Sequence, residues 1–171
     1  MSIAWNIYQS PLGPLTLTGG PAGLSQLSFP GKGVALDEAR RDPHAFTDAV
    51  IQLDEYFAGR RQRFDLALDL TGTPFQLAVW QALTEIPYGT TVSYSDVART
   101  IGRAERVRAV GAANGRNPIA VIVPCHRVIG ADGSLTGYGG GLHRKRALLD
   151  LEATGAGGQP SASGHRQLML M

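Results

Sequence analysis

The sequence has very little cysteine and no long hydrophobic run. Its 171 residues contain one cysteine, Cys125, which excludes an internal disulfide, a multi-cysteine zinc site and an iron–sulfur cluster. The longest apolar run, residues 119–123, is far shorter than the roughly 20 residues needed to span a bilayer. The first residues have neither a basic start nor a long apolar stretch, so no secretory signal is predicted. We therefore expect a cytoplasmic protein with no membrane segment and no bound metal.

Net charge is also low, at +2, but the charges are unevenly divided along the chain. Residues 99–146 contain nine basic and two acidic groups, a local charge of +7. The remainder contains seven basic and twelve acidic groups, a charge of −5. This division favours a polyanionic partner, although a solvated charged face would give the same counts.

The first seventy residues have the pattern of short strands and one helix. Asp42 can cap a helix with Pro43 at its first position, and Gly59 can end it. The apolar face of this predicted helix consists of Phe46, Val50, Leu53 and Phe57. Apolar residues alternate with smaller or polar ones in three segments, which predicts strands over residues 3–7, 15–18 and 64–70, and residues 24–29 are a further short candidate strand.

The rest of the chain has the pattern of short helices. Thr73 with Gln76, and Ser93 with Asp96, have the spacing of capping boxes, which predicts helix starts at residues 74 and 94. Another helix with interleaved arginines is predicted from Val107. Two short helices of which the second is basic resemble a helix-turn-helix, a pattern that many helical hairpins share without binding anything.

Cys125 follows a predicted buried strand over residues 119–123. A lone cysteine is most often a small buried hydrophobe. Here, however, His126 comes next and can accept a thiol proton, and the charge of Arg127 favours the thiolate. Because adjacent side chains on a strand point apart, a water would have to carry the proton to His126. The pattern indicates a nucleophilic cysteine, followed by a glycine-rich loop and a helix over residues 142–152.

The residues around Cys125 resemble the active-site signature of the O6-alkylguanine-DNA alkyltransferases, a family of direct-reversal DNA repair proteins. The signature is Pro124-Cys125-His126-Arg127-Val128. The resemblance covers about residues 74–152, and its other segments match in order and spacing: Ser93-Tyr94, Arg108-Ala109-Val110-Gly111, Asn117-Pro118, Gly137-Tyr138-Gly139-Gly140-Gly141, and Leu148-Leu149 with Glu152.

The resemblance implies an α/β (α+β) fold in two domains. Residues 1–72 would form a strand-rich domain with a small antiparallel sheet and a helix, similar to ribonuclease H. Residues 73–155 would form a mostly helical catalytic and DNA-binding domain with a winged helix-turn-helix. The composition of residues 156–171, rich in Gly, Ser, Ala and Gln, predicts a mobile tail.

The resemblance also implies an activity, the irreversible single-turnover transfer of an alkyl group to Cys125 from O6-alkylguanine or O4-alkylthymine in DNA. His126 would accept the thiol proton through a water, and Glu152 would orient and stabilise the imidazolium. Tyr94 would donate a proton or hydrogen bond to the departing guanine. The partner would be double-stranded DNA with the damaged base flipped out, bound by a monomer without a cofactor.

Further residues match DNA-contacting and base-binding positions of the family. Arg108 would enter the base stack as an arginine finger, and Asn117 would tie the recognition helix to the cysteine segment by backbone hydrogen bonds. Other expected DNA contacts are Ser93, Ala109, Gly111 and Arg127. The base pocket would be formed by Asn114, Val128, Leu135, Tyr138 and Gly139.

Two positions depart from part of the family, and three other functions stay open. Ala120 stands where some members carry proline, and Gly139 where some carry serine, so a roomier pocket is predicted. The alternatives are a non-catalytic relative that binds alkylated DNA, a helix-turn-helix DNA-binding regulator and a Cys-His hydrolase. Cys125 argues against the first, because such relatives lack the cysteine, and a regulator would need no reactive thiol. No pattern for an oxyanion site supports the third.

Overall fold

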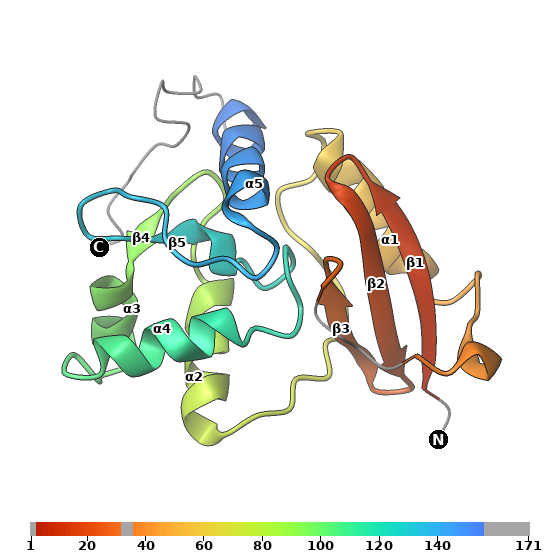
Figure 1. The fold of residues 1–171 in the computed structure, drawn as a ribbon, viewed down its shortest axis with the longest axis horizontal. Coiled ribbons are helices and arrows are strands. Elements are labelled where there is room, and N and C mark those ends of the chain that lie inside the picture. Colours follow the sequence, from red (N-terminus) through yellow and green to blue (C-terminus); the bar gives the residue numbers. More distant parts are fainter. Residues whose placement is uncertain (1–2, 32–35, 156–171) are drawn as a thin grey trace.

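The N-terminal half, residues 3–70, is a three-stranded antiparallel sheet with a helix against one face (Figure 1). The structure, a computed structural model, describes residues 3–31 and 36–155, so the tail predicted over residues 156–171 lies outside the described residues. The strands follow one another in the order β1-β2-β3 and confirm the strand predictions over residues 3–7, 15–18 and 24–29. The elements are β1 (Ala4–Ser10), β2 (Gly13–Gly20), β3 (Gly23–Ser28), a short 3-10 helix η1 (Glu38–Arg40) and α1 (Thr47–Phe57).

The helix α1 packs on the sheet through an aromatic contact and starts later than the sequence suggests. The rings of Tyr8 in β1 and Phe57 in α1 stack with centroids 6.3 Å apart. The predicted start at Asp42 is wrong, because its carboxylate accepts the amide hydrogen of His44 within a turn. The helix begins only after Phe46, which has a left-handed backbone conformation with φ of 63°.

The C-terminal half, residues 74–155, is mostly helical. Both predicted capping boxes are present: the Thr73 hydroxyl accepts from the amide of Gln76, and the Ser93 hydroxyl accepts from the amide of Asp96. Each box satisfies amides that a helix start leaves without partners, which is why these boundaries follow from local sequence. The elements are α2 (Pro74–Thr84), β4 (Val92–Ser93), α3 (Tyr94–Thr100), α4 (Val107–Gly115), the 3-10 helix η2 (Cys125–Arg127), β5 (Val128–Ile129) and α5 (Leu142–Gly155).

Two segments that the sequence predicts as strands do not form strands in the described part of the chain. Residues 64–70 keep the expected alternation of half-buried and exposed side chains, but they pair with β3 only at a single bridge between Leu68 and Leu24. Residues 119–123 form one bridge, between Ile119 and Leu27, and then turn. In both segments the apolar pattern reports burial, while the ladder of hydrogen bonds that defines a strand is missing.

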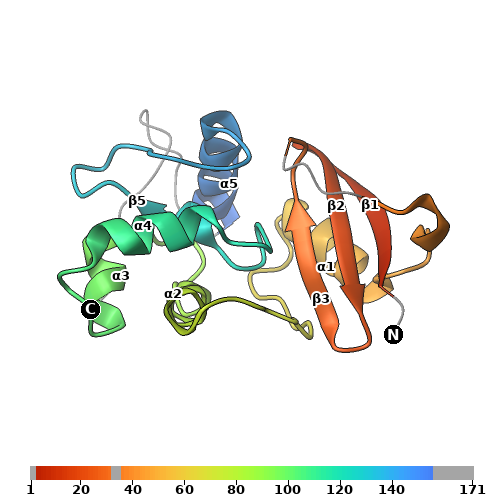
Figure 2. The same cartoon turned by 60° about the horizontal axis from the view of Figure 1, so that its bottom comes forward.

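The outer edge of β3 joins the two halves. Figure 2 shows β3 as the strand nearest the helical half. The amide of Leu27 donates to the carbonyl of Pro118, and the amide of Ala120 donates to the carbonyl of Leu27, each over 2.9 Å. Buried side chains from both halves form one continuous core. In the described part of the chain, none of the helices is long and apolar enough to cross a membrane.

Candidate active site

Cys125 is the first residue of the 3-10 helix η2, rather than the end of a strand as the sequence suggests. A tight reversal precedes it, in which the amide of Val123 donates to the carbonyl of Ile119. Val121 lies within this reversal at φ of 70°, a left-handed conformation that is unfavourable for a β-branched residue. Its side chain is fully buried, so the surrounding core holds this strained backbone in place.

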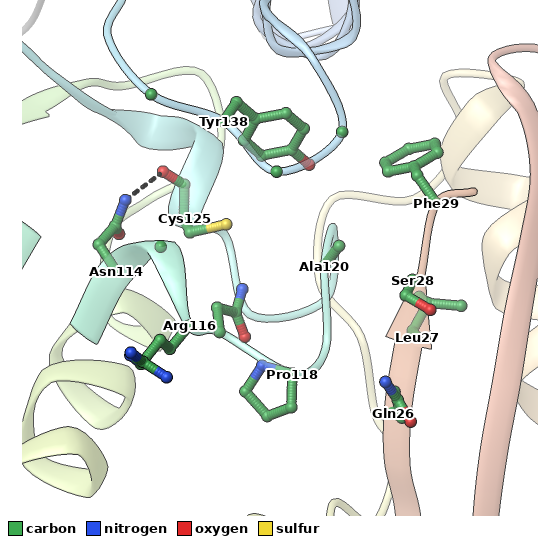
Figure 3. Close-up of a pocket in the computed structure, with 15 residues that line it drawn as sticks. Gln26, Leu27, Ser28, Phe29, Asn114, Arg116, Pro118, Ala120, Cys125 and Tyr138 are labelled. Carbon is green, nitrogen blue, oxygen red and sulfur yellow. Dashed lines mark hydrogen bonds between the residues drawn. The ribbon is translucent and has the colours of Figure 1, made fainter. Parts of the chain in front are cut away.

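A cavity of about 290 Å³ lies beside Cys125 and is lined by both halves. Figure 3 shows the sulfur atom pointing into the space near Tyr138 and Ala120. Gln26, Ser28 and Phe29, from β3 and the residue after it, form the opposite wall. This volume is near the lower end of the roughly 300–1,000 Å³ typical of ligand pockets. The remaining lining residues are Leu27, Asn114, Gly115, Arg116, Asn117, Pro118, Gly137, Gly139 and Gly140.

Three of the five predicted base-pocket residues line this cavity. Asn114, Tyr138 and Gly139 do so, and the Asn114 amide donates to the Cys125 carbonyl over 3.4 Å. Val128 lies in the core on β5, and neither it nor Leu135 is among the described lining residues. Phe29, which the sequence did not single out, packs against the edge of Tyr138 with ring centroids 6.4 Å apart.

His126, Arg127 and Glu152 form a buried cluster next to the cysteine. Nε2 of His126 lies 2.7 Å from Oε2 of Glu152, and both side chains are at most 1% exposed. Arg127 donates from Nε to Oε1 over 2.7 Å and from Nη2 to Oε2 over 2.9 Å. Nδ1 of His126 is buried without a hydrogen-bond partner in the described residues. The imidazole is therefore held on one side and has its second nitrogen available.

The cluster sets the protonation states of its members. Burial lowers the pKa of His126; Glu152 opposes this shift, and the cations Arg127 and Lys145 add to it. Burial alone would raise the pKa of Glu152, but the interactions with His126 and Arg127 outweigh it and bring the pKa well below its usual range. The structure thus places a neutral imidazole against a carboxylate at neutral pH, an arrangement that can accept a proton.

Two buried residues near this cluster were missed by the sequence analysis. The Tyr56 hydroxyl, from α1, donates to Oε2 of Glu152 over 2.6 Å. Lys145 in α5 donates to the carbonyls of Val128 and Thr136, and burial lowers its pKa to about 8 against the opposing charge of Cys125. Lys145, Leu148, Leu149 and Glu152 are all buried and have i, i+3, i+4, i+7 spacing, a signal that could have placed the lysine inward.

Tyr94 begins α3 and lies beside α4. Its hydroxyl donates to the Thr136 carbonyl over 3.4 Å and accepts from the Thr136 hydroxyl over 3.2 Å. Gly111 faces its ring, because a Cβ added to that glycine would lie 3.9 Å from Cδ1 of Tyr94. A methyl group at position 111 would therefore be in ordinary van der Waals contact with the tyrosine ring.

The residues expected to contact DNA separate into exposed and buried groups. Arg108 is exposed near the start of α4, with Ala109 half-buried next to it. Asn117 is buried and makes two backbone hydrogen bonds, donating to the Val123 carbonyl over 2.7 Å and accepting from the Ile119 amide over 3.0 Å. These bonds link the end of α4 to the reversal before Cys125.

Two expected DNA contacts need correction, because their side chains face inward. Arg127 is buried, donates to Glu152 and to the carbonyl of Ile86, and is therefore not available to phosphates. The buried Ser93 hydroxyl is used as the cap of α3. Lys145 is buried as well, so the basic segment is less basic at its surface than its count suggests. No three His, Cys, Asp or Glu side chains of the described residues gather closely enough to hold a metal ion.

Comparisons with known proteins identify both halves of the chain. Residues 74–154 match the family model described as 6-O-methylguanine DNA methyltransferase, DNA binding domain, and residues 3–70 match its ribonuclease-like domain. A Mycobacterium tuberculosis protein named methylated-DNA–protein-cysteine methyltransferase is 54% identical over 158 residues, covering 90% of this chain and 94% of the relative. One of the same name from Methanosarcina barkeri is 50% identical over 152 residues, covering 86% and 96%.

Solved structures agree with this match. The crystal structure of Mycobacterium tuberculosis OGT in complex with DNA is similar with a TM-score of 0.85 and 54% identity, covering 89% of this chain and 94% of that one. A methyltransferase from the archaeon Pyrococcus kodakaraensis has a TM-score of 0.52 at 22% identity, covering 88% and 98%, which supports the fold alone. The expected fold class, a small antiparallel sheet followed by a helical half, is confirmed.

Proposed function

This chain belongs to the 6-O-methylguanine DNA methyltransferase family, and on that basis we propose that it repairs DNA by moving an alkyl group from O6-alkylguanine to its own Cys125. The observation that carries the proposal is the position of Cys125 at a cavity, directly before a buried histidine whose Nε2 is held by Glu152. Nδ1 of that histidine, which has no hydrogen-bond partner in the part of the chain that the structure describes, can receive a proton. A surface or purely structural cysteine would need none of these features.

The transfer is a displacement at the alkyl carbon. The Cys125 thiol gives its proton through a water to Nδ1 of His126, and Glu152 stabilises the imidazolium through Nε2. The sulfur then forms a bond to the alkyl carbon as the bond from that carbon to O6 breaks. The bonding pair remains on guanine, which takes up one proton, so the net change moves the thiol proton to the base and the alkyl group to sulfur. A thiolate is a strong nucleophile near neutral pH, and the thioether is stable.

Tyr94 and Arg108 act on the base and the duplex. We assign to the Tyr94 hydroxyl a hydrogen bond to the guanine ring as negative charge develops there, after exchange of its present partner Thr136. A buried thiol cannot reach O6 of a paired guanine, so the nucleotide must be flipped out. The exposed Arg108 is the side chain that would fill the vacated place in the stack.

The rival functions are less well supported. A non-catalytic binder of alkylated DNA has no use for the cysteine, the oriented histidine and the buried carboxylate together. A regulator would likewise not require them.

Because the proposed substrate is DNA, we place the protein in the cytoplasm of a bacterial-type cell, where it would act as a single chain.

The proposal is tested by mapping the transferred group. The protein is incubated with a duplex containing one O6-methylguanine, digested and analysed by peptide mass spectrometry. We expect one added methyl on the peptide with Cys125, none with the unmodified duplex, and none in a Cys125→Ser variant that still binds the duplex. Methyl on another residue, or an unmodified protein after full exposure, would refute the assignment.

A further inference from the structure

The N-terminal half places one hydroxyl group inside the buried cluster of the C-terminal half. Tyr56 is the fully buried tyrosine of α1, 96 residues from its partner Glu152. The oxygen that it contacts, Oε2, is the same atom that Nε2 of His126 contacts at 2.7 Å. Burial and the neighbouring Glu152 charge raise the pKa of Tyr56, so the hydroxyl keeps its proton and acts as a donor.

We propose that Tyr56 is a positioning residue for the alkyl transfer: by sharing Oε2 of Glu152 with His126, its hydroxyl fixes the carboxylate and limits how strongly the imidazole holds a proton. The inference rests on the proposed function, in which His126 must be neutral before it can take the thiol proton. It assigns to the N-terminal half a direct influence on the chemistry at Cys125.

The geometry gives the influence a direction. Arg127 supplies one donor to Oε1 and one to Oε2, while Tyr56 and His126 complete the set on Oε2. A hydrogen bond from Tyr56 spreads the charge of this oxygen over a further partner and weakens its attraction for the imidazolium form. Removing the hydroxyl therefore strengthens the remaining pair and stabilises the protonated histidine.

Other ionisable groups around His126 do not replace this donor. Arg127 and Lys145 disfavour the imidazolium through their positive charge, from η2 and α5 respectively. The Arg127 guanidinium lies over the Tyr88 ring, with Cζ of Arg127 5.7 Å from the ring centroid. The Tyr88 hydroxyl has no hydrogen-bond partner among the described residues. The ionisable groups around the His126, Arg127 and Glu152 side chains are thus Tyr56, Tyr88, Cys125, Tyr138 and Lys145.

The test compares Tyr56→Phe with Tyr8→Phe in the full chain. Tyr8 provides a matched control, because its hydroxyl also donates to a carboxylate, Oδ1 of Asp54 over 2.7 Å, but this carboxylate belongs to the N-terminal half. Single-turnover methyl transfer is measured against pH, and the ring nitrogen signals of ¹⁵N-histidine are followed by NMR. In Tyr56→Phe we expect the His126 pKa and the midpoint of the acid limb of the rate profile to move up by about one pH unit. The transfer rate on the acid limb is then about tenfold lower at a given pH. In Tyr8→Phe neither should move.

Each alternative result has a defined meaning. A loss of thermal stability in Tyr56→Phe with an unchanged acid limb and unchanged His126 signals would show a structural role only and overturn the inference. An equal shift in both variants would also overturn it. If the wild-type chain transfers no methyl group, the proposed function fails, but the His126 signals still decide whether Tyr56 controls the imidazole.

Discussion

The two halves of the molecule differ in how deeply their ion pairs are buried. In the N-terminal half, Arg40 pairs with Asp37, Arg41 with Glu38 and Arg61 with Glu55, and all six side chains keep substantial contact with solvent. In the C-terminal half, the exposed Arg99 pairs with the buried Asp96, and the ion pair of Arg127 with Glu152 is almost completely buried. Exposed pairs are screened and contribute little, whereas a buried pair must satisfy every donor. The almost completely buried ion pair is the one that also holds His126, next to the cysteine of the proposed transfer.

The comparison also shows that the helical half does not complete the site alone. Residues of β3 and Phe29 form the cavity wall opposite Cys125, and Tyr56 enters the carboxylate cluster. Arg144 strengthens the same junction, because it donates to the carbonyls of Leu12 and Gly140 and lies over the Phe29 ring. We therefore propose that the predicted boundary near residue 72 separates two units that share one active site.

The largest contrast is expected between Glu152→Gln and Glu55→Gln. Glu152→Gln leaves Arg127 buried without its counter-ion, so we expect a loss of roughly 3–5 kcal/mol in the free energy of unfolding together with loss of methyl transfer. Glu55→Gln removes a partly exposed ion pair and should change the free energy of unfolding by no more than about 1 kcal/mol. Urea unfolding measures both, and similar small losses would contradict the distinction.

The same variant predicts a change in acid stability. The pKa of Glu152 is lowered in the folded protein, so its stabilising contribution is present above the unfolded pKa of about 4.3 and is lost as the pH falls towards the lower folded value. Urea unfolding between pH 3 and pH 6 should show this loss in the wild type and a weaker pH dependence in Glu152→Gln. Parallel curves for the two proteins would be inconsistent with a carboxylate held in its charged form.

Arg108→Ala should affect duplex repair far more than reaction with the free modified base. Arg108 is exposed on α4 and is not among the described residues that line the cavity, so its proposed action is on base flipping. Flipping from a stacked duplex requires a few kcal/mol, which predicts a roughly 100-fold slower transfer from DNA and no change with free O6-methylguanine. Single-turnover rates on the two substrates provide the measurement. Equal losses on both would show that the finger assignment is wrong.

Ala120→Pro tests the backbone link between the halves. The Ala120 amide donates to the Leu27 carbonyl, and proline has no amide hydrogen, so the bond would be lost and the carbonyl at the edge of β3 left without this donor. We expect a decrease of about 1–3 kcal/mol in the free energy of unfolding. Ala120→Ser keeps the amide and serves as the control in the same urea titration. A proline variant as stable as the serine variant would show that this bond does not hold the halves together.

The smallest expected effect concerns salt. Arg103, in the turn between α3 and α4, is exposed and forms no ion pair with a described residue, whereas Arg61 is paired with Glu55. Arg103→Ala should lower the slope of log affinity for undamaged DNA against log salt by about 1, and Arg61→Ala should leave it unchanged. Binding titrations at several salt concentrations decide this. Equal slopes in all three proteins would remove Arg103 from the DNA-binding face.

Sequence reasoning succeeded where the cause of structure is local. The starts of α2 and α3 were predicted from Thr73 and Ser93 because a capping side chain acts within three residues. It failed at Asp42, where a short-range hydrogen bond to the His44 amide formed a turn instead of a helix. It also failed for residues 64–70 and 119–123, because alternation and apolarity do not reveal whether a partner strand exists.

Long-range contacts account for the residues that were missed or misplaced in the site. The predicted apolar face of α1 includes the fully buried Leu53 and the half-buried Phe57 but omits Tyr56, which is fully buried as well. Its partner Glu152 is 96 residues away, a distance at which periodicity carries no information. Arg127 is expected at DNA from the family resemblance, but its guanidinium binds the buried carboxylate of Glu152 instead.

In the proposed function Cys125 is a terminal acceptor that keeps the alkyl group, and a stoichiometric titration tests this property. Cleaving a thioether would require activation of water against a carbon with a poor leaving group, and no lysine, carboxylate or second cysteine is among the described residues that line the cavity. Protein titrated against excess duplex containing O6-methylguanine should reach a plateau of one methyl group per chain, all of it on Cys125. Continued turnover beyond one methyl group per chain would contradict the account.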